Sequence, residues 1–392
     1  MALNTRSAVY LIALGAFALG MASYVTAGLI PMIQTSFSVS AAIAAQLVTA
    51  FTLAYGLGSP VFVALLPANR QRSGLLFSLG LFVIANAASA LSTDFTILLI
   101  FRAIAGVGAG IYLAMGIAAA AALSEPDQRG KAISVIMGGM ASGTVLGVPL
   151  SLLLAERFGW AIALWLVALL GAIAFIGLIT KLPMLPIAQT ISLKQKLMLL
   201  NDMHVVTILF VSLLAAIASL GMYTFIAPLL SDADYGAVHS ITPYLWVWGI
   251  GGVIGSFLIG PLVDRFQGPV LSFSIMIILA ISLFLLSPTA SIGSWFVMIP
   301  IAVWGAVGWA LQVPQNNELI KARELQGDGN LAVALNESAL YLGSAIGAAM
   351  GGILLLQNLS PWLLAAIAGV VAGLGAFIQF VNIKKHSKLR QY

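Results

Sequence analysis

Long apolar runs, each about as long as a membrane is thick, most strongly limit what this chain can fold into. A helix needs about 20 apolar residues to cross the hydrocarbon core of a bilayer. Charged and turn residues divide the chain into twelve runs of this kind. The runs are continuously apolar, whereas the strands of a membrane barrel alternate between polar and apolar residues. The sequence therefore predicts an all-α membrane protein with twelve transmembrane helices, at approximately residues 8–31, 41–66, 73–92, 96–122, 131–155, 160–180, 204–230, 240–263, 269–287, 294–314, 331–356 and 361–381.

Composition excludes several other classes of protein. Only 7% of the residues are charged, whereas a soluble domain carries roughly 25%. The chain has no cysteine, and its three histidines, His204, His239 and His386, lie far apart, so we expect no metal site and no cofactor. The net charge of +5 comes from short basic clusters between apolar runs, which does not indicate nucleic-acid binding. Paired carboxylates, histidine clusters or an activated serine are not evident within the runs, so we expect no enzyme.

Lysine and arginine predict the orientation of the helices, because these residues accumulate in cytoplasmic loops. All but two of the 17 basic residues fall on one side of the twelve-helix topology. The exceptions are Arg157, in a short outer loop, and Arg102, within the fourth run. Both termini are therefore expected in the cytoplasm.

The chain also contains an internal repeat with an offset of about 200 residues. Leu19-Gly20-Met21 of the first run matches Leu220-Gly221-Met222 of the seventh, and Gly143 and Gly147 of the fifth match Gly343 and Gly347 of the eleventh. We expect two six-helix halves that face the same way, residues 1–182 and 204–392, joined by a cytoplasmic linker at 183–203. Apolar residues at helical spacing around Lys194 and Lys196 favour an amphipathic helix in the linker, and a plain linker is the alternative.

The loop after the eighth run carries the sequence G260-P-L-V-D264-R265. It resembles the G-x-x-x-D-R loop of the major facilitator superfamily, a family of twelve-helix transporters. In that family the loop latches the cytoplasmic side through charge pairs, which implies this role for Asp264 and Arg265. The first half departs from the pattern, because Pro67 stands where the repeat places the aspartate.

The fourth run, R102-A-I-A-G106-V-G108, resembles another motif of the family. An arginine at this depth costs about 2.5–3.5 kcal/mol on insertion scales, so a functional role is the default interpretation. The alternatives are that Arg102 extends to the outer surface or ties helices together by hydrogen bonds.

The fifth run, G143-T-V-L-G147-V-P149, resembles the glycine and proline motif of the family's antiporters, and its surroundings resemble the drug- and sugar-efflux branch. Glycine and proline bend a helix and allow close packing. The resemblance implies that Gly143, Gly147 and Pro149 contribute to gating in an exporter. A bend without any bearing on transport direction is the alternative.

The first run departs from the efflux branch, which carries an acid where this chain has Ser23. A serine cannot carry the coupling proton. Glu337 is the remaining carboxylate within a run, because Glu318 and Asp264 lie at cytoplasmic helix ends, where solvation or loop pairing is expected. We therefore expect Glu337, tuned by Arg102, to couple transport to protons. Pairing of Glu337 with Lys321 or Arg323 near the inner surface is the alternative.

In this superfamily the first, fourth, seventh and tenth helices line the substrate cavity. Aromatic side chains with a few polar groups suit an amphipathic or planar organic ligand. Trp246, Trp248, Trp295 and Trp362 are interpreted instead as interface anchors or lipid-facing residues. The candidate substrate-binding residues are Tyr24, Arg102, Tyr112, Met115, Tyr223, Phe225, Trp304 and Gln312.

Together the resemblances imply a monomeric transporter in the bacterial inner membrane that exports a small organic molecule in exchange for protons. A drug, a sugar or a metabolite would fit, and neutral or anionic compounds are expected over lipophilic cations. An importer or facilitator of the same fold is one alternative. A membrane sensor or binding protein that has lost transport is the other.

Overall fold

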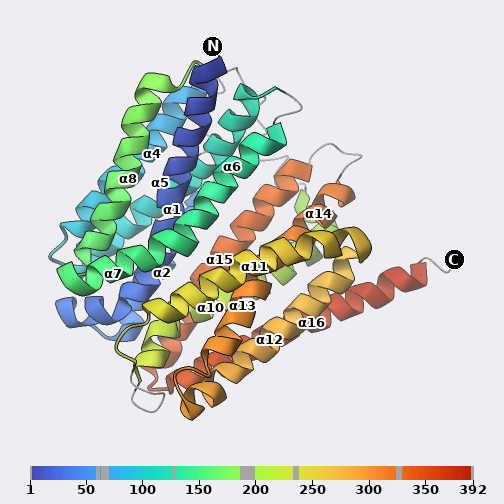
Figure 1. Cartoon of the computed structure of the whole chain (residues 1–392). Helices are drawn as coiled ribbons and strands as arrows, with labels where there is room; N and C mark the ends of the chain where they lie inside the picture. The colour runs from blue at the N-terminus through green and yellow to red at the C-terminus, as the bar shows by residue number, and fades with distance from the viewer. Residues whose placement is uncertain are drawn as a thin grey trace. The chain divides into compact units, whose positions relative to one another are not determined.

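The computed structural model describes residues 2–58, 62, 70–125, 129–185, 199–232, 238–323 and 329–389. Every regular element within these ranges is helical, as Figure 1 shows. The chain divides into two compact units, residues 1–193 and 194–392. The expected all-α fold is thus confirmed, whereas most of the expected linker helix lies outside the described residues.

The first unit consists of helices, two of which begin at a side-chain cap. The Ser40 hydroxyl accepts a hydrogen bond from the Ile43 N–H at 3.3 Å at one helix start. The Asp94 carboxylate caps another, through the N–H groups of Thr96 at 2.8 Å and Ile97 at 3.1 Å. The helices are α1 (Ala2–Phe37), α2 (Ala41–Leu53), α4 (Gln71–Ala90), α5 (Phe95–Leu123), α6 (Arg129–Ser142), α7 (Val148–Phe158) and α8 (Ala161–Lys181), with π-helical turns at Ala54–Gly58 and Gly143–Gly147.

The second unit repeats this plan. Its first long helix is capped by Asp202, whose carboxylate accepts hydrogen bonds from the N–H groups of His204 and Val205. A short 3₁₀ turn at Leu199–Asn201 precedes it. The helices are α10 (Met203–Ser231), α11 (Thr242–Arg265), α12 (Gly268–Ile292), α13 (Met298–Ala310), α14 (Gln312–Ala322), α15 (Gly329–Leu356) and α16 (Pro361–Leu389).

The two units use the same helix pairings, as a repeated half requires. In the first unit α1 packs against α6 and α8, and in the second α10 packs against α15 and α16. The glycines at equivalent positions also make the same contact. A methyl group at Gly106 of α5 would overlap the carbonyl oxygen of Phe51 in α2. In the second unit, a methyl group at Gly305 of α13 would overlap the carbonyl oxygen of Trp248 in α11. Two close backbone approaches are therefore preserved across the repeat.

Ten helical segments of the described residues are long and apolar enough to cross a membrane. Helices α11 and α13 occupy the positions of the eighth and tenth expected spans. The tenth differs from expectation, because the helix is interrupted at Leu311 and resumes as α14. Pro314 explains the break: its ring clashes with the carbonyl of the residue four positions earlier, which is Ala310.

Candidate functional site

Arg102 lies at the centre of a polar contact among four helices of the first unit. The side chain is 1% exposed. Its Nη2 donates a hydrogen bond to the Ala22 carbonyl oxygen of α1 at 2.8 Å, and Nη1 donates to Asn86 Oδ1 of α4 at 3.4 Å. The guanidinium carbon also lies 4.4 Å from the centre of the Phe51 ring of α2. Arg102 thus joins α5 to α1, α2 and α4.

The charge of Arg102 is incompletely compensated. Its Nε is buried without a hydrogen-bond partner, and the ion pairs recorded among the described residues do not include it. Contact with the face of an aromatic ring stabilises a cation but does not neutralise it. A buried guanidinium without a carboxylate partner makes this part of the first unit electropositive.

Ser23 occupies the position where the efflux branch carries an acid. Its hydroxyl donates a hydrogen bond to the Leu19 carbonyl oxygen at 2.9 Å, within its own helix α1. The side chain is buried and its hydrogen-bonding capacity is used locally. Tyr24, the next residue and a candidate for substrate binding, is half-buried.

Tyr112 and Met115, both on α5, lie inside the first unit. The Tyr112 hydroxyl donates to the Ile12 carbonyl oxygen of α1 at 3.0 Å, and its ring covers Gly15 so closely that a side chain there would overlap it. Met115 is buried as well. In this structure Tyr112 joins α5 to α1.

The second unit contains a cluster of four aromatic side chains, Tyr223, Trp248, Trp304 and Trp309. The rings of Tyr223 and Trp248 are 4.6 Å apart, and that of Trp304 lies 6.1 Å from Trp248. Trp309 lies 6.0 Å from Trp248 on another side. The Trp304 Nε1–H donates to the Ser219 hydroxyl at 2.7 Å. Two predicted substrate residues, Tyr223 and Trp304, are therefore close together.

Trp248 corrects one interpretation made from the sequence. It was expected at the membrane interface or facing lipid, yet it is 2% exposed and lies at the centre of the aromatic cluster. By contrast, Trp295 and Trp362 are exposed. The internal repeat could have predicted this burial, because Trp248 is equivalent to Phe51, whose ring contacts the Arg102 guanidinium in the first unit.

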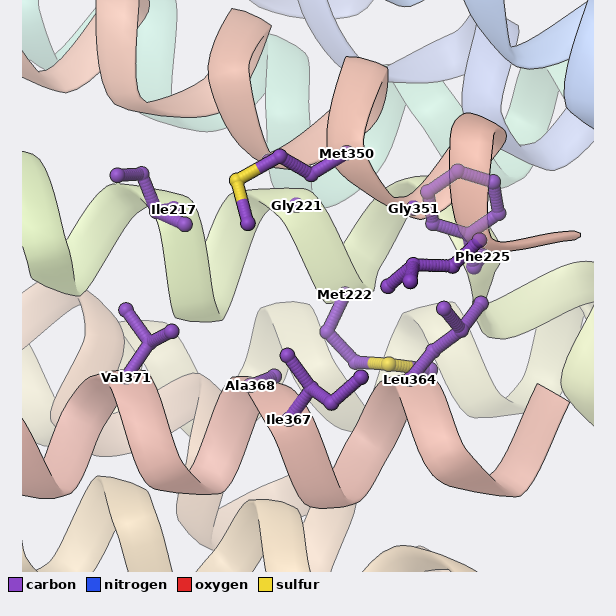
Figure 2. A pocket seen from close by; sticks show the side chains of 12 residues that line it. Ile217, Gly221, Met222, Phe225, Met350, Gly351, Leu364, Ile367, Ala368 and Val371 are labelled. Carbon is purple, nitrogen blue, oxygen red and sulfur yellow. The ribbon is translucent and has the colours of Figure 1, made fainter. Parts of the chain in front are cut away.

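Phe225 lies apart from this cluster, in an apolar hollow among α10, α15 and α16 (Figure 2). Its ring covers Gly351 of α15, and the side chains of Met222 and Leu364 meet beside it. The hollow is lined by apolar residues and is partly open to the surroundings. Gln312 is half-buried at the start of α14, directly after the break.

Glu337 lies in α15 beside a short series of polar contacts between helices. Its neighbour Asn336 is buried and donates a hydrogen bond to Asn316 Oδ1 of α14 at 2.8 Å. One residue earlier on α14, Gln315 Oε1 accepts a hydrogen bond from the Ser212 hydroxyl of α10 at 2.5 Å. Glu337 itself is half-buried. The contacts link α10, α14 and α15 through uncharged groups.

Glu318 also differs from expectation, because it is neither solvated nor paired with a loop. Its side chain is 12% exposed, and its Oε1 lies 3.3 Å from His204 Nε2 of α10. Burial raises the pKa of the Glu318 carboxyl to about 7. Burial also acts to raise the pKa of Asp202, but hydrogen bonds from two backbone N–H groups and from Arg323 hold it below its ordinary value. Arg323 Nη1 lies 3.1 Å from Asp202 Oδ2.

The antiporter-like motif of the fifth span forms a π-helical turn, Gly143–Gly147, between α6 and α7. Gly143 lies so close to α1 that a methyl group would overlap the Phe17 carbonyl oxygen, and Gly147 lies against Met21. Pro149 is buried in the first turn of α7.

In the latch motif Arg265 is exposed at the end of α11, whereas the Asp264 side chain lies outside the described part of the chain.

Comparison with known proteins identifies the family. The sequence profile described as Major Facilitator Superfamily matches residues 12–323. The chain belongs to this superfamily. It is therefore a multi-pass membrane transporter, and its fold is the twelve-helix fold of that family.

Relatives and solved structures agree with this assignment over nearly the whole chain. The inner membrane transport protein YdhP of Escherichia coli K12 is 28% identical over 375 residues, 95% of each chain. A chloramphenicol resistance protein of Streptomyces lividans is 28% identical over 93% of this chain and 95% of its own. The crystal structure of a mutant of the nucleoside transporter NupG is 14% identical, covers 96% of this chain and 99% of its own, and has a TM-score of 0.77.

Proposed function

We propose that this transporter exports a small organic molecule by alternating access, in exchange for protons. The observation that carries the proposal is the π-helical turn at Gly143–Gly147, seated against the backbone of α1. Glycine at a helix contact lets the two backbones approach closely, with no side chain between them. The turn therefore offers a place where α6 and α7 can move relative to α1 when the transporter changes conformation.

One relative supports export and another supports the membrane location. YdhP is an inner membrane transport protein, and the Streptomyces relative is a chloramphenicol resistance protein. A membrane transporter gives resistance to a drug most directly by removing it from the cytoplasm. By analogy with YdhP we place this chain in the bacterial inner membrane. The placement of the basic residues supports cytoplasmic termini, and we propose that the transporter is a monomer.

The charge of the first unit supports a neutral or anionic substrate. Arg102 is buried without a carboxylate partner among the described residues, and Ser23 replaces the acid of the efflux branch. A lipophilic cation would gain no charge pair here and would be repelled by the guanidinium. The proposed binding residues remain Tyr24, Arg102, Tyr112, Met115, Tyr223, Phe225, Trp304 and Gln312, with the pair Tyr223 and Trp304 supported by their contact in the aromatic cluster.

Proton exchange would supply the energy. Exchange of one proton for a neutral substrate gains roughly 2.3 kcal/mol for every 100 mV of membrane potential. Glu337 is the proposed carrier, because it is a half-buried carboxylate within a span and lies beside the polar contacts of α14 and α15.

The test is accumulation of substrate by everted inner-membrane vesicles with an acidic interior. Chloramphenicol serves as the neutral probe and ethidium as the cationic probe. We expect chloramphenicol or another neutral or anionic compound of a screened panel to accumulate, ethidium to be excluded, and a protonophore to abolish accumulation. Uptake by intact cells without accumulation in everted vesicles would instead establish the importer. Strong accumulation of ethidium that persists in Glu337→Gln would refute the predicted substrate class.

A further inference from the structure

The end of the second unit formed by the start of α10 and the end of α14 contains a partly buried titratable pair. His204 occupies the first turn of α10, and Glu318 lies in the second half of α14. An apolar cluster of Val205, Ile208, Leu209, Leu319 and Ala332 packs beside the pair and holds α10, α14 and α15 together. The proposed topology places this end on the cytoplasmic side of the membrane.

The geometry brings an imidazole and a carboxylate into contact with little water. His204 Nε2 lies 3.3 Å from Glu318 Oε1, and the two side chains are 28% and 12% exposed. The second oxygen, Glu318 Oε2, is buried without a hydrogen-bond partner. It faces the start of α12, where a Cβ at Gly268 would lie 3.2 Å from it. Because Gly268 has no side chain, Glu318 Oε2 can lie close to the backbone of α12.

The other charged side chains near the pair are joined to each other or exposed. Asp202, the N-cap of α10, is joined at 3.1 Å to Arg323, which follows the last residue of α14. On α14, Lys321 is exposed, and on α11, Arg265 is exposed. The first turn of α12, Gly268 to Leu271, contains no titratable residue, and α15 contributes Glu337 from within the span. The Asp264 side chain lies outside the described part of the chain.

We propose that His204 and Glu318 together form a proton-binding site at the end of the second unit, separate from Glu337. The pair takes one proton from water and shares it between the imidazole nitrogen and the carboxylate oxygen. When that proton returns to water, the pair changes from neutral to a single negative charge.

The bound proton has a mechanical consequence for the two helices. With it, a charge-assisted N–H···O contact joins α10 to α14. Without the proton, the Glu318 carboxylate is charged and its buried Oε2 has no hydrogen-bond partner. Water can reach this oxygen when α14 separates from α10, so loss of the proton favours separation of the two helices. The elevated pKa of Glu318 agrees with a proton that is exchanged near neutral pH. The inference goes beyond the proposed export and does not depend on it.

The site can be tested by proton binding alone, on the purified full-length transporter in lipid nanodiscs. Infrared difference spectra recorded between acidic and alkaline pH report the carboxylic-acid carbonyl, and isotope-labelled histidine reports the imidazole. We expect a carboxylic-acid band that disappears with rising pH near neutrality. The measurement is made in a Glu337→Gln background, where the proposed proton carrier cannot contribute. In that background the band should be present, should remain when the matched control Asp94→Asn is added, and should disappear when Glu318→Gln is added.

His204→Gln gives an independent test, because it retains the carboxyl group. The midpoint of the Glu318 band should move by about one pH unit, the coupling expected for titratable groups in contact. The inference is overturned by a neutral-pH band that survives in the double variant Glu318→Gln, Glu337→Gln, or by a Glu318 midpoint that is unchanged in His204→Gln. Because no transport is measured, failure of this site and failure of proton-driven export are distinguishable.

Discussion

At the scale of the residue, Arg102 combines three contacts that a lysine cannot reproduce together. Its planar fork donates to Ala22 and Asn86 while its face covers the Phe51 ring. We expect Arg102→Lys to lower stability by about 2 kcal/mol, because hydrogen bonds of charged groups contribute about 1.5–3 kcal/mol each. Thermal melting of the purified variant measures this. Arg157→Lys, at an exposed arginine in the last turn of α7, should melt like the wild type. A wild-type melting temperature in Arg102→Lys would contradict a role in joining the helices.

Glu318 should make stability depend on pH in a defined direction. Its folded-state pKa is about 7 against an ordinary 4.5, so the folded state binds more protons than the unfolded state between these values. Stability therefore falls as pH rises through this window, by up to about 3 kcal/mol. We expect the melting temperature of the wild type to fall between about pH 5 and pH 8. The decline should be shallower in Glu318→Gln, and parallel curves for the two proteins would contradict the prediction.

Individual residues also show where sequence reasoning reaches its limit. Arg102 and Ser23 could be selected from the sequence, because charge within an apolar run is costly and a missing acid is visible against the family pattern. Trp248 and Glu318 could not be placed. A tryptophan near a helix end can be an anchor or a core residue, and a terminal glutamate can be solvated or buried. Only the rotation of α11 and the approach of α14 to α10 decide between these outcomes.

At the scale of the helix, lengths and positions of the spans follow from apolar length and charge, but interruptions do not. Pro314 accounts for the break at Leu311, but Pro31, Pro228 and Pro288 lie inside helices that continue, so a proline alone does not predict a break. The π-helical turn at Gly143–Gly147 leaves no comparable signal, because glycine permits it without requiring it. Its position becomes clear only from the backbone of α1 that it contacts.

The contact of this turn with α1 yields a matched pair of substitutions. A methyl group at Gly143 would overlap the Phe17 carbonyl oxygen, whereas one at Gly138 of α6 meets nothing within 4 Å. We expect Gly143→Ala to destabilise the protein by about 1–3 kcal/mol, the usual effect of overpacking, and to reduce transport in everted vesicles. Gly138→Ala should be neutral or slightly stabilising, since alanine favours helix more than glycine does. Equal behaviour of the two variants would remove the support for a gating contact at Gly143.

At the scale of the whole molecule, the distribution of basic residues predicts an orientation that can be measured directly. The chain contains no cysteine, so single cysteines can be introduced without first removing any. Thr93 is exposed in the turn between α4 and α5, and Ser73 is exposed near the start of α4. The positive-inside rule places Thr93 outside and Ser73, next to Arg72, inside. We expect a membrane-impermeant maleimide to label Thr93→Cys in spheroplasts and Ser73→Cys only in everted vesicles. The opposite pattern would invert the topology, and it would also move the His204–Glu318 pair to the outer side, where its proton would exchange with the periplasm.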